Sequence, residues 1–378
     1  MVNASEQSLP LPEAELPAPL RRFCKVTTPA KMRLMAAKGL VPVRGSDQVT
    51  LVVQLSADPD DEVRQAARES LARLPDSILW SACEAELHPA VLDALALFLA
   101  HSEPVLMRVV GNPAVLDSTL ARIAALGGEH VSERIATNEQ RLLGAPRIVE
   151  ALYKNPATRM STADRLLELA VRNGLELRGI PMFEQAAQAV QGQLIPEPSE
   201  EPLPTDVAFQ ESLQQDDDDP EAIERDRVDG SESLKQKYQP LAMRIAQMSL
   251  TEKLRLSFVG NAAARALLVR DCNKQVAMSA LSSPKFTVKE ALEVAHSRAV
   301  DESLLRYIAN KRDWLRNGEL KRALVFNPKT PVGLSLRFLS HMRLSDLKAL
   351  TKSRNVAAQI KAAASQYLMR RERAGRAH

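Results

Sequence analysis

The heptapeptide Leu324-Val325-Phe326-Asn327-Pro328-Lys329-Thr330 has a diverged counterpart in Leu152-Tyr153-Lys154-Asn155-Pro156-Ala157-Thr158. The two begin at positions 152 and 324, an offset of 172 residues. Upstream of them, Ser283-Pro284 follows Asn112-Pro113 with an offset of 171. An offset that stays nearly constant across such a span is hard to obtain by chance. It predicts an internal duplication, in which the second half of the chain contains a diverged copy of the first.

The composition favours close-packed helices. The chain has 378 residues, of which 45% are hydrophobic and 4% aromatic, and that length suits two or three domains of about 100–200 residues. Ala lets helices approach closely and Leu fills the seam between them. Apolar residues also recur at helical spacing, as in Val63, Ala67 and Leu71. We therefore predict an all-α fold.

Cysteine usage and hydropathy indicate the compartment. Cys24, Cys83 and Cys272 are far apart and odd in number, which is typical of reduced thiols and not of a disulfide framework. No apolar run approaches the roughly 18 residues of a membrane span. The segment from Met1 to Pro19 lacks the basic and apolar regions of a signal peptide. We expect a cytoplasmic protein with no membrane contact.

One segment resembles a known type of repeat. Asp58 to Leu71 reads Asp-Pro-Asp-Asp-Glu-Val-Arg-Gln-Ala-Ala-Arg-Glu-Ser-Leu, in which a polar turn leads into a helix, and Ile360 to Leu368 is a second instance. This pattern resembles the second half of a HEAT-type repeat. The resemblance extends to leucine-rich-repeat variants and to uncharacterised bacterial families of HEAT-like repeats. It implies short helix pairs stacked as an α-solenoid, and it implies no particular activity.

Composition divides the chain into four segments. Residues 1–20 are rich in Pro, Glu, Ser and Ala and are predicted to be a disordered N-terminal tail. Residues 21–190 are the first HEAT-like helical repeat domain. Residues 191–232 form an acidic, Pro-rich linker that includes the run Asp216–Asp219, and we expect it to be disordered. Residues 233–378 are the second HEAT-like domain, which is basic.

Asparagines mark several of the turns between helices. Asn112, Asn155 and Asn327 each precede Pro, and Asn310 precedes Lys. Asn side chains satisfy free backbone donors at helix starts, and Pro ends the preceding helix. We therefore expect these four asparagines to be structural helix-turn residues and not ligands.

Basic residues follow the turns of the second copy. Equivalent turns of stacked repeats line up, so we predict a basic stripe along one edge that contacts an anionic partner. The predicted stripe consists of Lys274, Lys285, Lys311, Arg312, Lys329, Lys352 and Arg354. The equivalent places in the first copy hold Asp60, Glu103, Ala114, Glu139 and Ala157, so the fold does not require lysine there. Lys is also a common solvated turn residue, and that interpretation stays open.

The motifs of common catalytic and cofactor sites are missing from the sequence. No Cys or His pair has metal-ligand spacing, and there is no phosphate loop, nucleophile elbow or dinucleotide fingerprint. Asp313-Trp314 invites comparison with helical-repeat DNA glycosylases, but adjacent side chains on a helix point about 100° apart. We expect Trp314 to be a core anchor. The sequence predicts no enzymatic activity, no metal and no cofactor.

Two hypotheses for function remain. The first is a non-enzymatic protein-protein interaction or regulatory scaffold built from helical repeats, whose basic second domain meets an anionic partner. The second is a nucleic-acid-binding protein that contacts phosphates through the same domain. The anionic partner in the first case is another protein or, in an intramolecular contact, the chain's own Asp216–Asp219 run.

Overall fold

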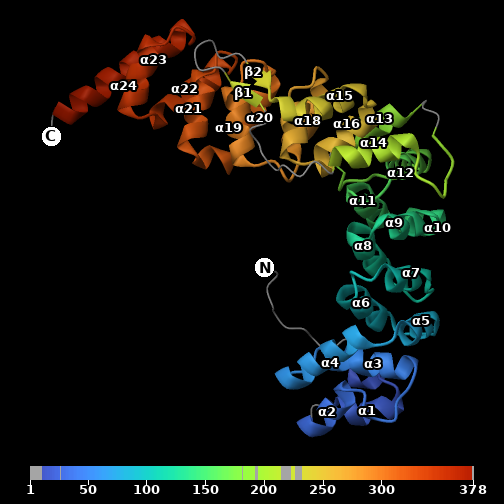
Figure 1. Cartoon of the computed structure of the whole chain (residues 1–378). Helices are drawn as coiled ribbons and strands as arrows, with labels where there is room; N and C mark the ends of the chain where they lie inside the picture. The colour runs from blue at the N-terminus through green and yellow to red at the C-terminus, as the bar shows by residue number, and fades with distance from the viewer. Residues whose placement is uncertain are drawn as a thin grey trace. The chain divides into compact units, whose positions relative to one another are not determined.

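The computed structural model of the chain describes residues 11–25, 27–180, 182–191, 195–213, 223–225 and 232–376, and Figure 1 shows the order of their elements. These residues form 24 α-helices, four short 3-10 helices and one pair of short strands. The predicted all-α class is confirmed. The chain divides into two compact units, Met1–Gly179 (unit 1) and Ile180–His378 (unit 2).

Unit 1 consists of one short 3-10 helix and twelve α-helices among the described residues. They are η1 (Glu13–Glu15), α1 (Ala18–Cys24), α2 (Ala30–Ala37), α3 (Ser46–Leu55), α4 (Asp61–Arg73), α5 (Asp76–Glu84), α6 (Pro89–Phe98), α7 (Glu103–Gly111), α8 (Asp117–Leu126), α9 (Glu129–Ala136), α10 (Glu139–Gly144), α11 (Pro146–Lys154) and α12 (Met160–Arg172).

Unit 2 contains the remaining helices and both strands. They are α13 (Phe183–Val190), α14 (Pro204–Leu213), β1 (Ile223–Arg225), β2 (Glu232–Leu234), η2 (Gln236–Tyr238), α15 (Gln239–Gln247), α16 (Leu250–Val259), α17 (Ala262–Leu268), α18 (Lys274–Ser282), α19 (Val288–His296), α20 (Glu302–Ile308), η3 (Trp314–Arg316), α21 (Gly318–Phe326), α22 (Val332–Phe338), η4 (Leu339–His341), α23 (Leu344–Lys352) and α24 (Ala358–Arg376). The strands pair antiparallel, with Ile223 opposite Leu234.

Each helix packs mainly on helices that are close to it in sequence. In unit 1, α5 packs on α7 and α8 on α11; in unit 2, α16 packs on α18 and α19 on α21. The apolar positions of α4 that the sequence singled out, Val63, Ala67 and Leu71, are buried. Asp60 caps this helix, because its carboxylate accepts hydrogen bonds from the amides of Glu62 and Val63. Local polar turns therefore start helices whose apolar stripes form the core.

A similar order of elements occurs in both units, with the 3-10 helix η3 of unit 2 in the place of α10. Helices α7 and α18 start at 103 and 274, an offset of 171, and α8 and α19 start at 117 and 288, with the same offset. Helices α11 and α21 start at 146 and 318 and end at 154 and 326, an offset of 172. Helices α12 and α22 start at 160 and 332, again 172 apart.

Three of the four asparagines join the ends of neighbouring helices. Asn327 follows the end of α21, and its Nδ2 donates to the carbonyls of Ala295 and Ser297, at 2.8 and 2.7 Å, where α19 ends. Its Oδ1 accepts from the amide of Lys329 at 3.0 Å. Asn112 binds the end of α5 in the same way, and Asn155 the end of α8. We call this arrangement the Asn clamp.

The clamp differs in detail from the expected role. The three side chains are buried and bind carbonyls of a preceding, parallel helix, so they satisfy acceptors at helix ends and not only donors at helix starts. Asn310 is exposed and makes no side-chain hydrogen bond to the described residues. The contacts agree with a structural role for Asn112, Asn155 and Asn327, and they give Asn310 no such role.

The structure corrects the predicted N-terminal tail. Residues 1–10 lie outside the described residues, but residues 11–20 contain η1 and the start of α1. Leu11, Leu16 and Leu20 are buried, and the backbone of Leu11 both donates to and accepts from the side-chain amide of Gln54. Three leucines four or five residues apart supply enough apolar surface to order a Pro-rich segment.

The predicted linker and domain boundary also differ from the structure. Helix α13, predicted to end the first domain, packs on α16 of unit 2. Helix α14 lies within the predicted disordered linker, yet Phe209 is fully buried with the Arg255 guanidinium 5.1 Å from its ring centroid. One large aromatic side chain provides α14 with an anchor that the acidic composition conceals. The run Asp216–Asp219 lies outside the described residues.

Candidate functional site

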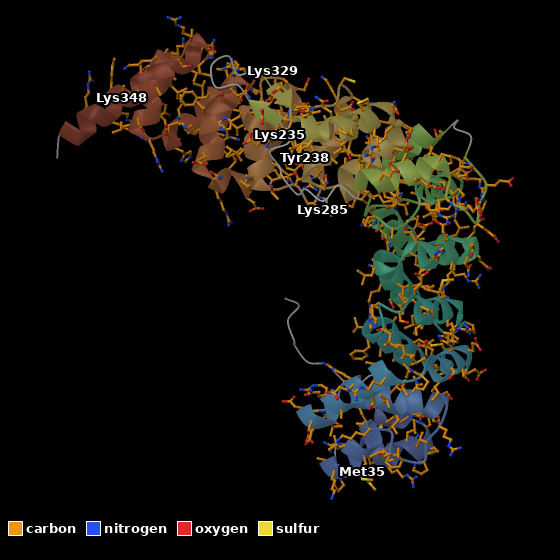
Figure 2. All side chains as sticks on the ribbon, viewed as in Figure 1. Met35, Lys235, Tyr238, Lys285, Lys329 and Lys348 are labelled. Atoms are coloured by element: carbon orange, nitrogen blue, oxygen red, sulfur yellow. The ribbon has the colours of Figure 1, made fainter. Side chains whose placement is uncertain are left out.

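Successive helices of unit 2 reverse direction, so its turns fall on two edges. Lys285 follows the end of α18, and its Nζ donates to the carbonyl of Val259 at the end of α16, at 3.1 Å. Lys329 follows the end of α21, and its Nζ donates to the carbonyl of Ala299, just after α19, at 3.4 Å. Because α19 runs from one edge to the other, these two lysines lie at opposite edges, as Figure 2 shows.

We call the edge that carries Lys285 the Lys311 edge, after the lysine at its centre. This edge also has an aromatic cluster. The ring of Trp314 lies 5.8 Å from that of Phe286 and 6.3 Å from that of Tyr307, measured between centroids. The Nζ of Lys311 lies 5.1 Å from the Tyr307 ring and 5.4 Å from the Trp314 ring. The turn after α18 and the turn after α20 therefore meet, and cation–π contacts hold Lys311 at their junction.

Further cations surround this cluster. Arg312 and Arg316 are exposed, and Arg316 lies 3.9 Å from Asp313 in a pair that is almost fully solvated. Arg337, at the end of α22, donates to the carbonyl of Ala309 at 2.5 Å, which places α22 next to the end of α20. The charge of Arg337 remains uncompensated in that contact. The result is an edge on which positive groups outnumber exposed carboxylates.

An acidic residue close to this edge is neutralised inside the core. Glu290, in the first turn of α19, accepts from Arg265 Nε at 2.9 Å, and both side chains are about 95% buried. Glu290 also completes a capping box with Thr287. Its carboxylate is therefore satisfied twice and does not cancel the surface charge of Lys285 or Lys311.

The opposite edge, here the Lys329 edge, has its own ion pair. Lys274 Nζ lies 3.2 Å from the carboxylate of Asp301, which caps α20. Hydrogen bonds from the side chain and backbone of Ser303, then from Lys274, lower the pKa of Asp301 to about 2. Lys274 thus has a local partner.

Lys352 and Arg354 belong to the Lys329 edge by topology. Helix α22 ends on the Lys311 edge, where Arg337 donates to the carbonyl of Ala309, so the next α-helix, α23, starts on that edge. The nine residues of α23 span about 13 Å along the helix axis, so this helix ends on the Lys329 edge. Lys352 ends this helix and Arg354 follows it.

The prediction of a single basic stripe was therefore wrong. Three of the seven residues lie on the Lys311 edge: Lys285, Lys311 and Arg312. The other four lie on the Lys329 edge: Lys274, Lys329, Lys352 and Arg354. Similar turn sequences need not share an edge, because each helix between them reverses the direction of the chain. Lys285 and Lys329 also bind carbonyls at helix ends, which is a stabilising role in its own right.

The sequence did not predict the aromatic part of the Lys311 edge. Trp314 is half-buried at the surface and is not the expected core anchor, and Tyr307 is half-buried beside it. The short sequence spacing of Tyr307, Lys311 and Trp314 around one turn is the signal that could have predicted this aromatic cluster. Asp313 is highly exposed and, among the described residues, forms an ion pair with Arg316.

Two of the three thiols are buried, and their pKa values are raised. Burial raises the pKa of Cys24 to about 12, helped by the Asp58 carboxylate, and burial raises that of Cys83 to about 11. Among the described residues, no three His, Cys, Asp or Glu side chains are grouped to hold a metal ion. No helix in the described ranges is long and apolar enough to cross a membrane.

Comparison with known protein families, with curated proteins and with solved structures gives no match for this chain. The geometry of the described residues is therefore the basis on which a function can be proposed.

Proposed function

We propose that this chain is a non-enzymatic binding protein of stacked helix pairs that holds an acidic protein segment along the Lys311 edge. The observation that carries the proposal is the meeting of Lys285, Lys311 and Arg312 beside a half-buried Trp314. Trp and Arg are the residues most often found at the centres of protein interfaces. The restriction of the edge to unit 2 agrees with the basic composition of that half.

The architecture supports a binding role. We propose that the two sets of helices with offsets of 171 and 172 arose by internal duplication and form HEAT-like solenoids. Stacked helix pairs present long surfaces on which separate turns contribute to one contact. Between the copies, Glu139 and Gln140 correspond to Lys311 and Arg312, so only the second copy acquired positive charge at this turn.

Nucleic acid is a second candidate partner, favoured by one observation. Tyr307 and Trp314 are half-buried at the surface next to Lys311, and aromatic rings beside cations are typical of sites that stack single-stranded bases. Lys311 and Phe286 already cover part of the indole ring, so a base would have to displace the lysine. We therefore rank this candidate second.

The test uses the full-length chain and two fluorescent polyanions, a 20-residue polyglutamate and a 20-nucleotide oligo-dT. Binding is measured by fluorescence anisotropy between low salt and 1 M salt. One variant replaces Lys311, Arg312 and Arg316 by Ser. The matched control makes the same change of charge on the other edge, with Lys329, Lys352 and Arg354 replaced by Ser.

We expect polyglutamate to bind at low salt and to dissociate toward 1 M, where the screening length falls to about 3 Å. The Lys311-edge variant should bind it at least tenfold more weakly than the control variant. Equal weakening in the two variants would refute the proposed edge. Preferential binding of oligo-dT that Trp314→Ala reduces by about 1–3 kcal/mol would favour the nucleic-acid alternative.

A further inference from the structure

A pocket of about 500 Å³ opens in unit 1 where the ends of α7 and α9 meet α10. Three buried aliphatic side chains, Ile135, Leu142 and Ile148, form part of its wall. The charged residues of its lining are Arg134, Glu139 and Arg141. This volume lies within the range of small-ligand pockets, and a lining that combines aliphatic with charged side chains favours an amphipathic group.

Unit 2 shows what fits at the equivalent position. Helices α11 and α21 begin 172 residues apart, at 146 and 318, and this offset aligns Leu142 with Trp314 and Ile135 with Tyr307. In unit 2 the indole of Trp314 therefore lies against Tyr307, where unit 1 has two aliphatic side chains. Leu and Ile are smaller than Trp and Tyr, so unit 1 has room that unit 2 fills with its own aromatic rings.

The aligned arginines Arg134 and Arg306 differ in their ion pairing. Arg306 aligns with Arg134, and Arg306 pairs with Glu302 of its own helix at 2.6 Å. The residue that precedes Arg134 by four is His130, so the carboxylate is missing. Arg134 is exposed and makes no ion pair among the described residues, whereas Arg141 already holds Asp117 at 2.7 Å.

The mouth of the pocket is open. Gly111, the last residue of α7, lines the pocket, and a Cβ atom added to it would meet nothing within 4 Å. Ser282 is the aligned residue in unit 2. The absence of a side chain at Gly111 therefore leaves the pocket open at this point.

We propose that this pocket receives the aromatic side chain of a partner polypeptide, with an acidic residue next to that side chain held by Arg134. The partner's aromatic ring occupies the position that Trp314 occupies in unit 2. The partner's carboxylate pairs with Arg134 as Glu302 pairs with Arg306 in unit 2. This site is separate from the Lys311 edge and does not depend on it.

The test uses fluorescein-labelled pentapeptides, Asp-Asp-Trp-Asp-Asp and Asp-Asp-Ala-Asp-Asp, with the full-length chain. The chain also carries the Ser substitutions at Lys311, Arg312 and Arg316, which remove acidic binding at the edge of unit 2. Anisotropy should show that the Trp peptide binds at least tenfold more tightly than the Ala peptide, because only the former buries a ring. Equal binding of the two peptides would overturn the proposal.

Two substitutions fill the pocket independently. Leu142→Trp copies the residue of unit 2, and Gly111→Leu adds a side chain at the mouth, where its Cβ atom would have no neighbour within 4 Å. Each should reduce the affinity for the Trp peptide to that for the Ala peptide. Leu126→Trp, on the exposed end of α8, is the matched control and should leave binding unchanged. If circular dichroism shows that Leu142→Trp is unfolded, Gly111→Leu decides, and unchanged binding in that variant overturns the proposal.

The carboxylate contact is tested by Arg134→Gln. A third peptide, Lys-Lys-Trp-Lys-Lys, should bind the parent chain at least fivefold more weakly than the acidic Trp peptide. Arg134→Gln should abolish this difference and preserve the preference for Trp over Ala. A difference that persists in the variant would refute the role of Arg134.

Discussion

Replacing Asn327 with Ala should destabilise unit 2 by about 2–4 kcal/mol. The change removes two hydrogen bonds, at 2.8 and 2.7 Å, to the carbonyls that end α19, and one at 3.0 Å from the amide of Lys329. Each bond contributes about 0.5–1.5 kcal/mol, and a buried group left unsatisfied costs about 1–3 kcal/mol. Asn327 is only 5% exposed, so water replaces few of these contacts.

The measurement is urea unfolding followed by the fluorescence of Trp314. A Trp80→Phe background makes the signal specific for unit 2, because the chain has two tryptophans. Asn310→Ala is the matched control: that side chain is exposed and makes no hydrogen bond to the described residues, so its loss should cost less than about 0.5 kcal/mol. Equal free energies of unfolding for the Asn327 and Asn310 variants would refute the clamp.

Three further outcomes are expected. Iodoacetamide at pH 8 should modify exposed Cys272 first, and Cys24 and Cys83 only in urea, since burial keeps their thiols protonated; mass spectrometry of the native protein with all three sites labelled would contradict this. The lowered pKa of Asp301 adds stability that is complete above about pH 4 and is lost as the pH falls toward 2. Asp301→Asn should flatten that part of the pH profile of the urea midpoint. Phe209→Ala should cost about 3–5 kcal/mol in urea unfolding of unit 2, and a cost below 1 kcal/mol would mean that α14 is not docked.

The helices could be predicted from local sequence because their signals are local. Val63, Ala67 and Leu71 have helical spacing, and Asp60 provides the cap at the position where α4 begins. A single buried residue in an otherwise polar segment produces no periodic pattern in the sequence. Phe209 lies among acidic residues and prolines, and its burial depends on Arg255 in a helix some forty residues later.

The arrangement of the candidate site could be predicted only in part. Lys311 and Arg312 were found because they follow a turn, but the edge on which a turn lies depends on how many helices reverse the chain before it. The number of reversals cannot be counted from the sequence where a very short helix intervenes, such as the three-residue η3 at Trp314–Arg316. The ring contacts of Trp314 depend on Phe286, which comes from a turn one helix pair earlier.

The Asn clamp has a consequence for how each unit responds to force or denaturant. When the later helix of a clamped pair opens, the earlier helix loses the donor for two of its terminal carbonyls, and those carbonyls are buried. Opening one helix therefore weakens the helix to which it is clamped, and this couples parts of a unit that would otherwise unfold in separate steps. In a pulling experiment, Asn155→Ala should divide one large extension of unit 1 into smaller steps, because the opening of α11 would no longer weaken α8.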